Sequence, residues 1–147
     1  MTPRPQRPLW PCPACGRVFA NANQSHACGR HELEIHFAGK LPRVREVYEA
    51  FLAMLAEIGP VTVLPEKSRI AFQVRMSFAQ LTVRRRWVVG HFVLARRVDD
   101  PAFIRVETLS PRNHVHHFRL ERVGEIERLS DYAREAYAVG RQEHLRA

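Results

Sequence analysis

The sequence predicts an α+β protein: an antiparallel sheet of five to six strands, covered on one face by two helices and preceded by a small zinc-binding module. Three observations support this prediction. Apolar and polar residues alternate through three short runs between Arg69 and Ala95, as in strands that bury one face. Apolar residues recur at three- and four-residue steps between Pro42 and Ile58, as in a helix that covers such a face. A C-x-x-C motif lies near the start of the chain.

The first helix is expected from Pro42 to Ile58. Proline suits the first turn because its ring fixes φ near the helical value and its missing N–H needs no partner there. Gly59-Pro60 ends the helix, since proline cannot continue it. The residues expected to face the sheet are Val44, Val47, Tyr48, Phe51, Leu52, Leu55 and Ile58.

The other elements follow from alternation and turn residues. Short strands are expected around residues 61–64, 70–74, 79–83, 88–94, 104–108 and 116–120. Asp99-Asp100-Pro101 and Pro111-Arg112-Asn113 provide turns between the later strands. A second helix is expected from about Glu125 to Gly140, because its apolar residues again fall on one face.

The composition fits a folded protein with one main core. At 147 residues and 46% hydrophobic residues, the chain can bury one core and carry a small appended module. We therefore expect a proline-rich lead and metal module over residues 1–31 and an α+β domain over residues 32–147. With 23 basic and 15 acidic residues the net charge is +8, which favours nucleic acid or another anionic partner.

The chain lacks the run of about 18 to 20 apolar residues that would cross a membrane. The best candidate, Val88 to Ala95, is interrupted by His91. Residues 1–10 are rich in proline and include no apolar stretch of the kind found in signal peptides. Three cysteines, two of them in a C-x-x-C, suit a reducing compartment in which thiols bind a metal. We expect a cytoplasmic protein.

Four residues near the N-terminus have the spacing of a metal site. Cys12, Cys15, His26 and Cys28 form the pattern C-x2-C-x10-H-x-C. Three sulfurs and one imidazole are a soft tetrahedral set that suits structural Zn(II). His31 is an alternative fourth ligand in place of Cys28. A segment of about 30 residues cannot bury a core of its own, so metal binding should supply most of its folding free energy.

Basic and aromatic residues are expected on the polar face of the sheet. Arg75, Arg84, Arg85, Arg86 and Trp87 are the candidate nucleic-acid contacts, because cationic side chains bind phosphates and aromatic rings stack on bases. On this interpretation the protein is a non-enzymatic accessory binding module. The alternative is a groove for a small molecule or peptide between the sheet and the helices.

Histidines in one predicted strand suggest a third function, an enzyme. His114, His116 and His117 lie close in sequence, and the first two share a face of the strand. That face also carries Phe118 and Leu120, so His116 is expected to be a buried, hydrogen-bonded core residue. The chain contains no phosphate loop, nucleophile elbow or H-E-x-x-H motif.

Several short segments form a recognisable set when taken together. They are Trp10 to Cys28, His36-Phe37-Ala38-Gly39-Lys40, Gly59-Pro60-Val61, Arg69-Ile70-Ala71-Phe72, His116-His117-Phe118 and Glu135-Ala136-Tyr137. This set resembles an uncharacterised bacterial family, domain of unknown function 5655. The resemblance covers about Glu34 to Gly140, with the cysteine segment as a frequent N-terminal companion. It implies an accessory module, because relatives occur at the ends of larger proteins labelled as predicted transport or endonuclease-like, and it assigns no catalytic residue.

Overall fold

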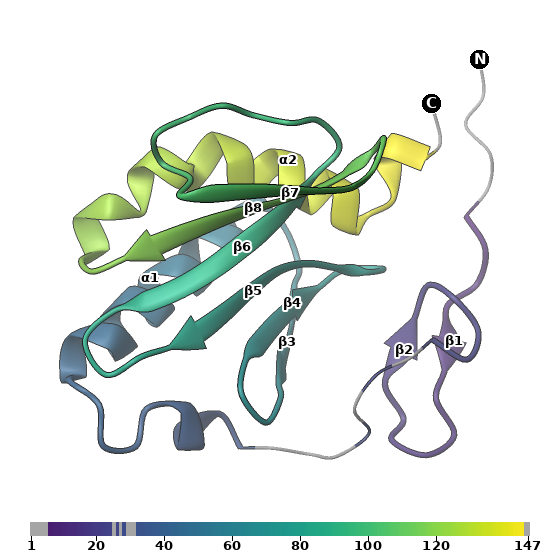
Figure 1. Ribbon diagram of the computed structural model, residues 1–147. Helices are drawn as coiled ribbons and strands as arrows, with labels where there is room; N and C mark the ends of the chain where they lie inside the picture. Colours follow the sequence, from purple (N-terminus) through teal and green to yellow (C-terminus); the bar gives the residue numbers. More distant parts are fainter. Residues whose placement is uncertain (1–5, 25, 27, 29–31, 146–147) are drawn as a thin grey trace.

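The computed structural model describes residues 6–24, 26, 28 and 32–145. It is an α+β structure with two α-helices, a six-stranded antiparallel sheet and a small two-stranded sheet near the N-terminus (Figure 1). No helix in these described ranges combines the length and apolar character needed to cross a membrane.

The first helix and the strands of the main sheet lie close to their predicted positions, whereas the small N-terminal sheet was not predicted. The helices are α1 (Pro42–Ile58) and α2 (Ser130–Gly140), and the small sheet pairs β1 (Trp10–Pro11) with β2 (Val18–Phe19). The main sheet contains β3 (Thr62–Pro65), β4 (Ile70–Gln73), β5 (Ser77–Val83), β6 (Val88–Leu94), β7 (Arg105–Ser110) and β8 (Asn113–Leu120). Single 3-10 turns are η1 (Leu33–His36), η2 (Val123–Glu125), η3 (Glu127–Leu129) and η4 (Glu143–Leu145).

The strand order of the main sheet is β3-β4-β5-β6-β8-β7. The three alternating runs that predicted a meander are β4, β5 and β6, and they are neighbours. The last two strands do not follow their order in the sequence. β8 pairs with β6, and β7 lies at the edge of the sheet beyond β8. Residues 95–104 connect β6 to β7, which is long enough to carry the chain past the position that β8 then fills.

Both helices lie on the same side of the sheet (Figure 1). Phe51 of α1 packs against Phe72, Phe92 and Phe118 of three strands, with ring centroids 5.3 to 5.8 Å apart. All four rings are completely buried. These aromatic side chains fill the space between α1 and the sheet, where a ligand-binding groove was the alternative expectation. The packed rings leave no room for a ligand at that position.

Two irregularities explain why the alternation in the sequence was imperfect. A bulge opposite Phe72 and Gln73 inserts Phe78 into β5, so that Phe78 and Ala79 are both buried. Gly90 interrupts β6 on its covered face, where a Cβ would lie 2.4 Å from the Gln80 carbonyl oxygen. Glycine is required at that position because backbone, which cannot rotate away, occupies the space.

The C-terminal helix begins later than predicted. Two 3-10 turns, η2 and η3, occupy the first part of the expected helix, and α2 starts at Ser130. The Glu125 side chain bonds back to the Arg122 backbone N–H at 2.9 Å, which stabilises the tight turn over a longer helix. The apolar periodicity continued through these turns because Ile126 and Leu129 are buried there as well.

His116 is a core residue on the covered face of β8. Its side chain has no exposed surface. Its Nε2 accepts a hydrogen bond from the Val98 backbone N–H at 2.9 Å, and its Nδ1 donates to the His114 carbonyl oxygen at 2.9 Å. Burial lowers the pKa of His116, so this neutral tautomer is favoured. Both ring nitrogens are used inside the fold, which leaves none for a substrate.

Replacing His116 by glutamine should therefore destabilise the fold. We expect a loss of about 1 to 3 kcal/mol in the free energy of unfolding, because a buried backbone N–H or carbonyl loses its partner. Urea denaturation monitored by circular dichroism measures it. His117→Gln, at the neighbouring position on the open face where the side chain is 22% exposed, is the control and should change stability much less. Unchanged stability of the His116→Gln protein would contradict the structural role.

Candidate metal centre and the open face of the sheet

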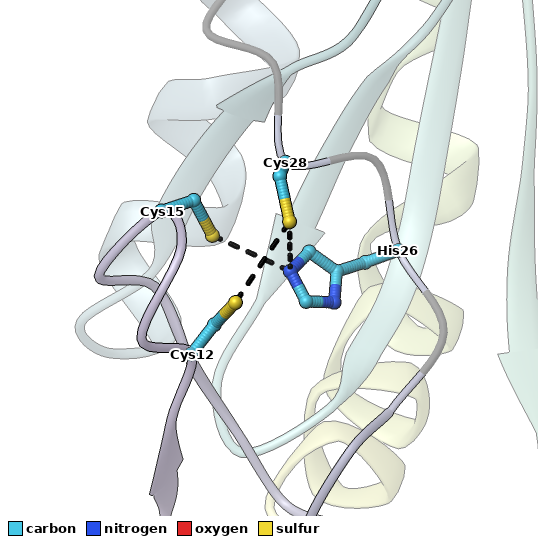
Figure 2. A group of neighbouring side chains, drawn as sticks. All are labelled: Cys12, Cys15, His26 and Cys28. Atoms are coloured by element: carbon cyan, nitrogen blue, oxygen red, sulfur yellow. Dashed lines mark hydrogen bonds between the residues drawn. The ribbon is translucent and has the colours of Figure 1, made fainter.

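Four side chains converge at the N-terminal end of the chain. The ligand atoms of Cys12, Cys15, His26 and Cys28 all lie within 4.8 Å of one another and could hold a metal ion (Figure 2). Cys15 Sγ and Cys28 Sγ lie 3.3 and 3.4 Å from His26 Nε2, and Cys12 Sγ lies 3.8 Å from Cys28 Sγ. Sulfurs bound tetrahedrally at about 2.3 Å from zinc would be separated by about 3.8 Å. These three separations lie near that value, and the four side chains could hold one metal ion.

Local structure aims these ligands at a common point. Cys12 and Cys15 lie on the turn between β1 and β2, which the Cys12 N–H closes on the Arg17 carbonyl at 2.7 Å. Gly16 follows the second cysteine at φ +76°, a backbone conformation that favours glycine. His26 Nδ1 donates to the Gln24 carbonyl at 2.6 Å, which leaves Nε2 turned toward the three sulfurs.

The backbone around the cysteines also favours negative charge. Backbone hydrogen bonding from Cys15, the largest cause, lowers the pKa of the Cys12 thiol to about 6. The hydrogen bond to the Cys12 side chain, followed by burial and then by the charge of Cys12, raises the pKa of Cys28 to about 11. A bound metal ion would remove the repulsion between the two thiolates. The proposed alternative ligand His31 lies outside the described residues.

The hairpin that carries the cysteines touches the main sheet. The Gln73 amide donates to the Val18 carbonyl at 2.6 Å. Arg75 bonds to the Arg7 carbonyl and, at 3.0 Å, to the Gln142 side chain. Arg75 was predicted to contact nucleic acid, but its guanidinium group joins the N-terminal segment to the C-terminal end of the domain and lies apart from the other predicted arginines.

The other predicted nucleic-acid contacts lie together at the β5–β6 turn. Arg84, Arg85 and Arg86 are all exposed. Trp87 is half-buried, and the guanidinium carbon of Arg119 lies 4.3 Å from the centre of its ring. Trp87 is therefore a surface aromatic residue beside the arginine turn and does not belong to the buried core.

Cationic residues from three separate segments surround a cavity of about 440 Å³ next to this turn. Its lining includes Lys40, Lys67, Arg69 and Arg84 and contains no carboxylate side chain. Burial, and then the charge of Arg84, lower the pKa of Lys40. Lys67 and Arg84 form no ion pair within the part of the chain that the structure describes. Sequence reasoning missed Lys40, Lys67 and Arg69, because only the tertiary fold brings them near Arg84.

A second cavity, of about 500 Å³, lies on the face of the sheet opposite the helices. Its lining includes Arg69, Gln80, Thr82, His91, Arg105 and His117. The strand registers place Gln80 beside His91, His91 beside His117, and His117 beside Arg105. The histidine cluster expected in β8 is thus divided: His114 and His116 are buried under the sheet, and His117 lies on this open face.

Carboxylates neutralise much of the charge around the second cavity. Glu107 lies 2.6 Å from His117 Nε2 and 2.9 Å from the Arg105 guanidinium. The rings of His91 and His117 meet edge to face with centroids 5.5 Å apart. Burial, with a smaller contribution from His117, lowers the pKa of His91 to about 4. His91 is therefore neutral at physiological pH.

The pKa of His91 predicts a loss of stability in mild acid. Its ordinary pKa is 6.5, so between pH 6.5 and about 4 the unfolded chain binds a proton that the folded chain does not. The free energy of unfolding should fall as pH falls through this window. His91→Gln should make the free energy of unfolding fall less steeply between pH 6.5 and 4 than it does in the wild type. Above pH 7.5 the pH dependence of the two proteins should be alike, because His91 is neutral there in both the folded and the unfolded chain. Some loss of stability in acid should remain in the His91→Gln protein, because the pKa of His116 is lowered as well. A His91→Gln protein with the wild-type slope would contradict the assignment.

Comparison with known proteins identifies the domain. A family model described as Domain of unknown function (DUF5655) matches residues 34–140. The match covers both helices and the entire main sheet and begins after the cysteine segment. No curated protein and no solved structure matches the chain significantly. From residue 34 to residue 140 the chain belongs to the DUF5655 family, a domain whose function is unknown.

Proposed function

We propose that this protein is a non-enzymatic binding module that carries a structural zinc ion and binds single-stranded nucleic acid on the open face of its sheet. The observation that carries the proposal is the cavity whose lining brings Lys40, Lys67, Arg69 and Arg84 together without a carboxylate. Arg69 pairs with Glu66 outside that lining, whereas the other three cations form no ion pair within the described residues. Cations gathered in this way repel one another. An anion bound among them relieves the repulsion, and the phosphates of nucleic acid are a repeating series of such anions.

The layout of the sheet favours a single strand of nucleic acid, rather than a small compact anion, as the ligand. The helices cover one face and leave the other for a ligand, the arrangement by which several antiparallel sheets bind single strands. Arg85 and Arg86 extend the cationic surface beyond the cavity. Trp87, already stacked against Arg119, offers a partly exposed ring beside this surface.

Zinc is the proposed ion because of the ligand chemistry. Three thiolates and one imidazole are soft ligands in a tetrahedral arrangement, which zinc prefers. All four positions would be filled by the protein, so the ion has no open position for a substrate. Its role is to stabilise the fold of the cysteine segment, because that segment has too few residues to bury a core of its own.

Metal analysis tests the zinc site. We expect about one zinc per chain in purified protein and none in a Cys12→Ser, Cys15→Ser double variant, by elemental analysis. The double variant should keep its far-UV circular dichroism and cooperative unfolding, because the core of the main sheet lies within residues 42–140. Cys28→Ser should weaken zinc binding in competition with a chelator, whereas His31→Ala should not. Zinc retained by the double variant would contradict the ligand set.

Salt dependence tests nucleic-acid binding. Affinity for short single-stranded DNA or RNA, measured by fluorescence anisotropy, should fall log-linearly with salt because bound phosphates release counterions. Replacing Arg84, Arg85 and Arg86 by glutamine should weaken binding and flatten the slope by about 0.7 for each phosphate that the variant no longer neutralises. The control variant removes the same charge near α2, by glutamine at Arg96, Arg128 and Arg134. Undetectable binding at about 50 mM salt, or equally weakened binding in both variants, would contradict the proposal.

A further inference from the structure

We propose that the cavity of about 500 Å³ on the open face is a pocket for one unpaired base of the bound strand. This inference rests on the proposed function. It adds that the protein binds a nucleobase in addition to the phosphates. The volume falls within the usual range for pockets that hold small organic groups. A paired base would be out of reach, because its edge and faces are occupied within a duplex.

The first argument is the set of polar groups available inside the cavity. The side chains of Gln80, Thr82 and His91 form no hydrogen bond with any other residue that the structure describes, although each lines the cavity. An amide, a hydroxyl and a neutral imidazole each offer both a donor and an acceptor. The edge of a nucleobase presents the same mixture. A phosphate, which is chiefly an acceptor, would leave their acceptors unused.

The second argument is the balance of charge. Glu107 neutralises Arg105 and bonds to His117, and Glu66 pairs with Arg69 at 3.1 Å. This cavity therefore lacks the excess of cations found around Lys40 and Lys67. An uncharged ring fits the second cavity better than a phosphate does, and the phosphates are left to the first.

The third argument is the shape of the walls. Glu107 holds the Arg105 guanidinium in place, and the His91 and His117 rings stand edge to face beside it. Flat guanidinium and imidazole groups are surfaces on which bases stack. Ile104, with 67% of its surface exposed, adds an apolar edge at the rim.

The two cavities also adjoin each other. Arg69 and Thr82 line both of them. A nucleotide can therefore place its phosphate among the lysines and arginines of the first cavity and its base in the second. This juxtaposition is a consequence of the fold, since Arg69 precedes β4 and Thr82 lies in β5.

Oligonucleotides of equal charge test the inference. The probes are single-stranded DNA oligomers of one length that contain only A, only C or only T, and a fully abasic oligomer with the same number of phosphates. We expect the abasic oligomer to bind about 10-fold more weakly than the best homopolymer, and the homopolymers to differ from one another by about 5-fold or more. Equal binding of all four would overturn the base pocket and leave nucleic-acid binding intact.

Two kinds of variant separate the base from the phosphates. Gln80→Ala and His91→Ala, each checked by thermal melting, should reduce the differences among homopolymers and leave binding of the abasic oligomer unchanged. Arg84→Gln should instead weaken all four oligomers by the same factor. If Gln80→Ala and His91→Ala both preserve the wild-type preference, the preference arises elsewhere and the inference is wrong.

Two further outcomes distinguish this inference from the function on which it rests. If no oligomer binds at low salt, the proposed function fails and the base pocket fails with it. If a free nucleoside monophosphate binds as tightly as the oligomers and Gln80→Ala abolishes that binding, the cavity is a mononucleotide site and its assignment to a strand is overturned.

Discussion

Burial of one face of the six-stranded sheet beneath two helices is the constraint on which the remaining structure depends. The completely buried rings of Phe51, Phe72, Phe92 and Phe118 fill the space between α1 and the sheet. Because these described side chains fill that side, we expect a ligand to reach the sheet from the opposite side. The same constraint gives His114 and His116 structural positions, whereas His117, one residue away, points to the open face.

The open face is divided by its electrostatics into two unlike regions. Around Lys40 and Lys67 the cations lack carboxylate partners in the cavity lining, and their mutual repulsion favours an anion. Around His91 and Arg105 the carboxylate of Glu107 restores the balance. Desolvation keeps His91 neutral there. The proposed ligand, a single strand of nucleic acid in which charged phosphates alternate with uncharged bases, would match this division.

The cysteine segment is attached to the domain through polar contacts. Gln73 and Arg75 hold carbonyl oxygens of the N-terminal segment, and a cavity of about 430 Å³ lies between that segment and the sheet, lined on one side by Phe19 and His26. The Gln73 Oε1 atom is buried without a partner in the part of the chain that the structure describes. A few polar contacts of this kind contribute less to stability than the aromatic core does. We therefore expect the segment to depend on a bound metal ion and the domain to fold without one.

The sequence by itself determined most of the elements and the cluster of candidate metal ligands, because both depend on residues that are close in the chain. Alternation identified β4 to β6, helical spacing identified α1, and three cysteines and a histidine within 17 residues identified the candidate metal cluster. The exchange of β7 and β8 and the bulge at Phe78 were decided by long-range pairing, which alternation does not encode. The two cavities were decided in the same way. Lys40 and Arg84, or His91 and His117, are brought together by strand register and by the docking of α1, and nothing in their local sequence shows that they meet.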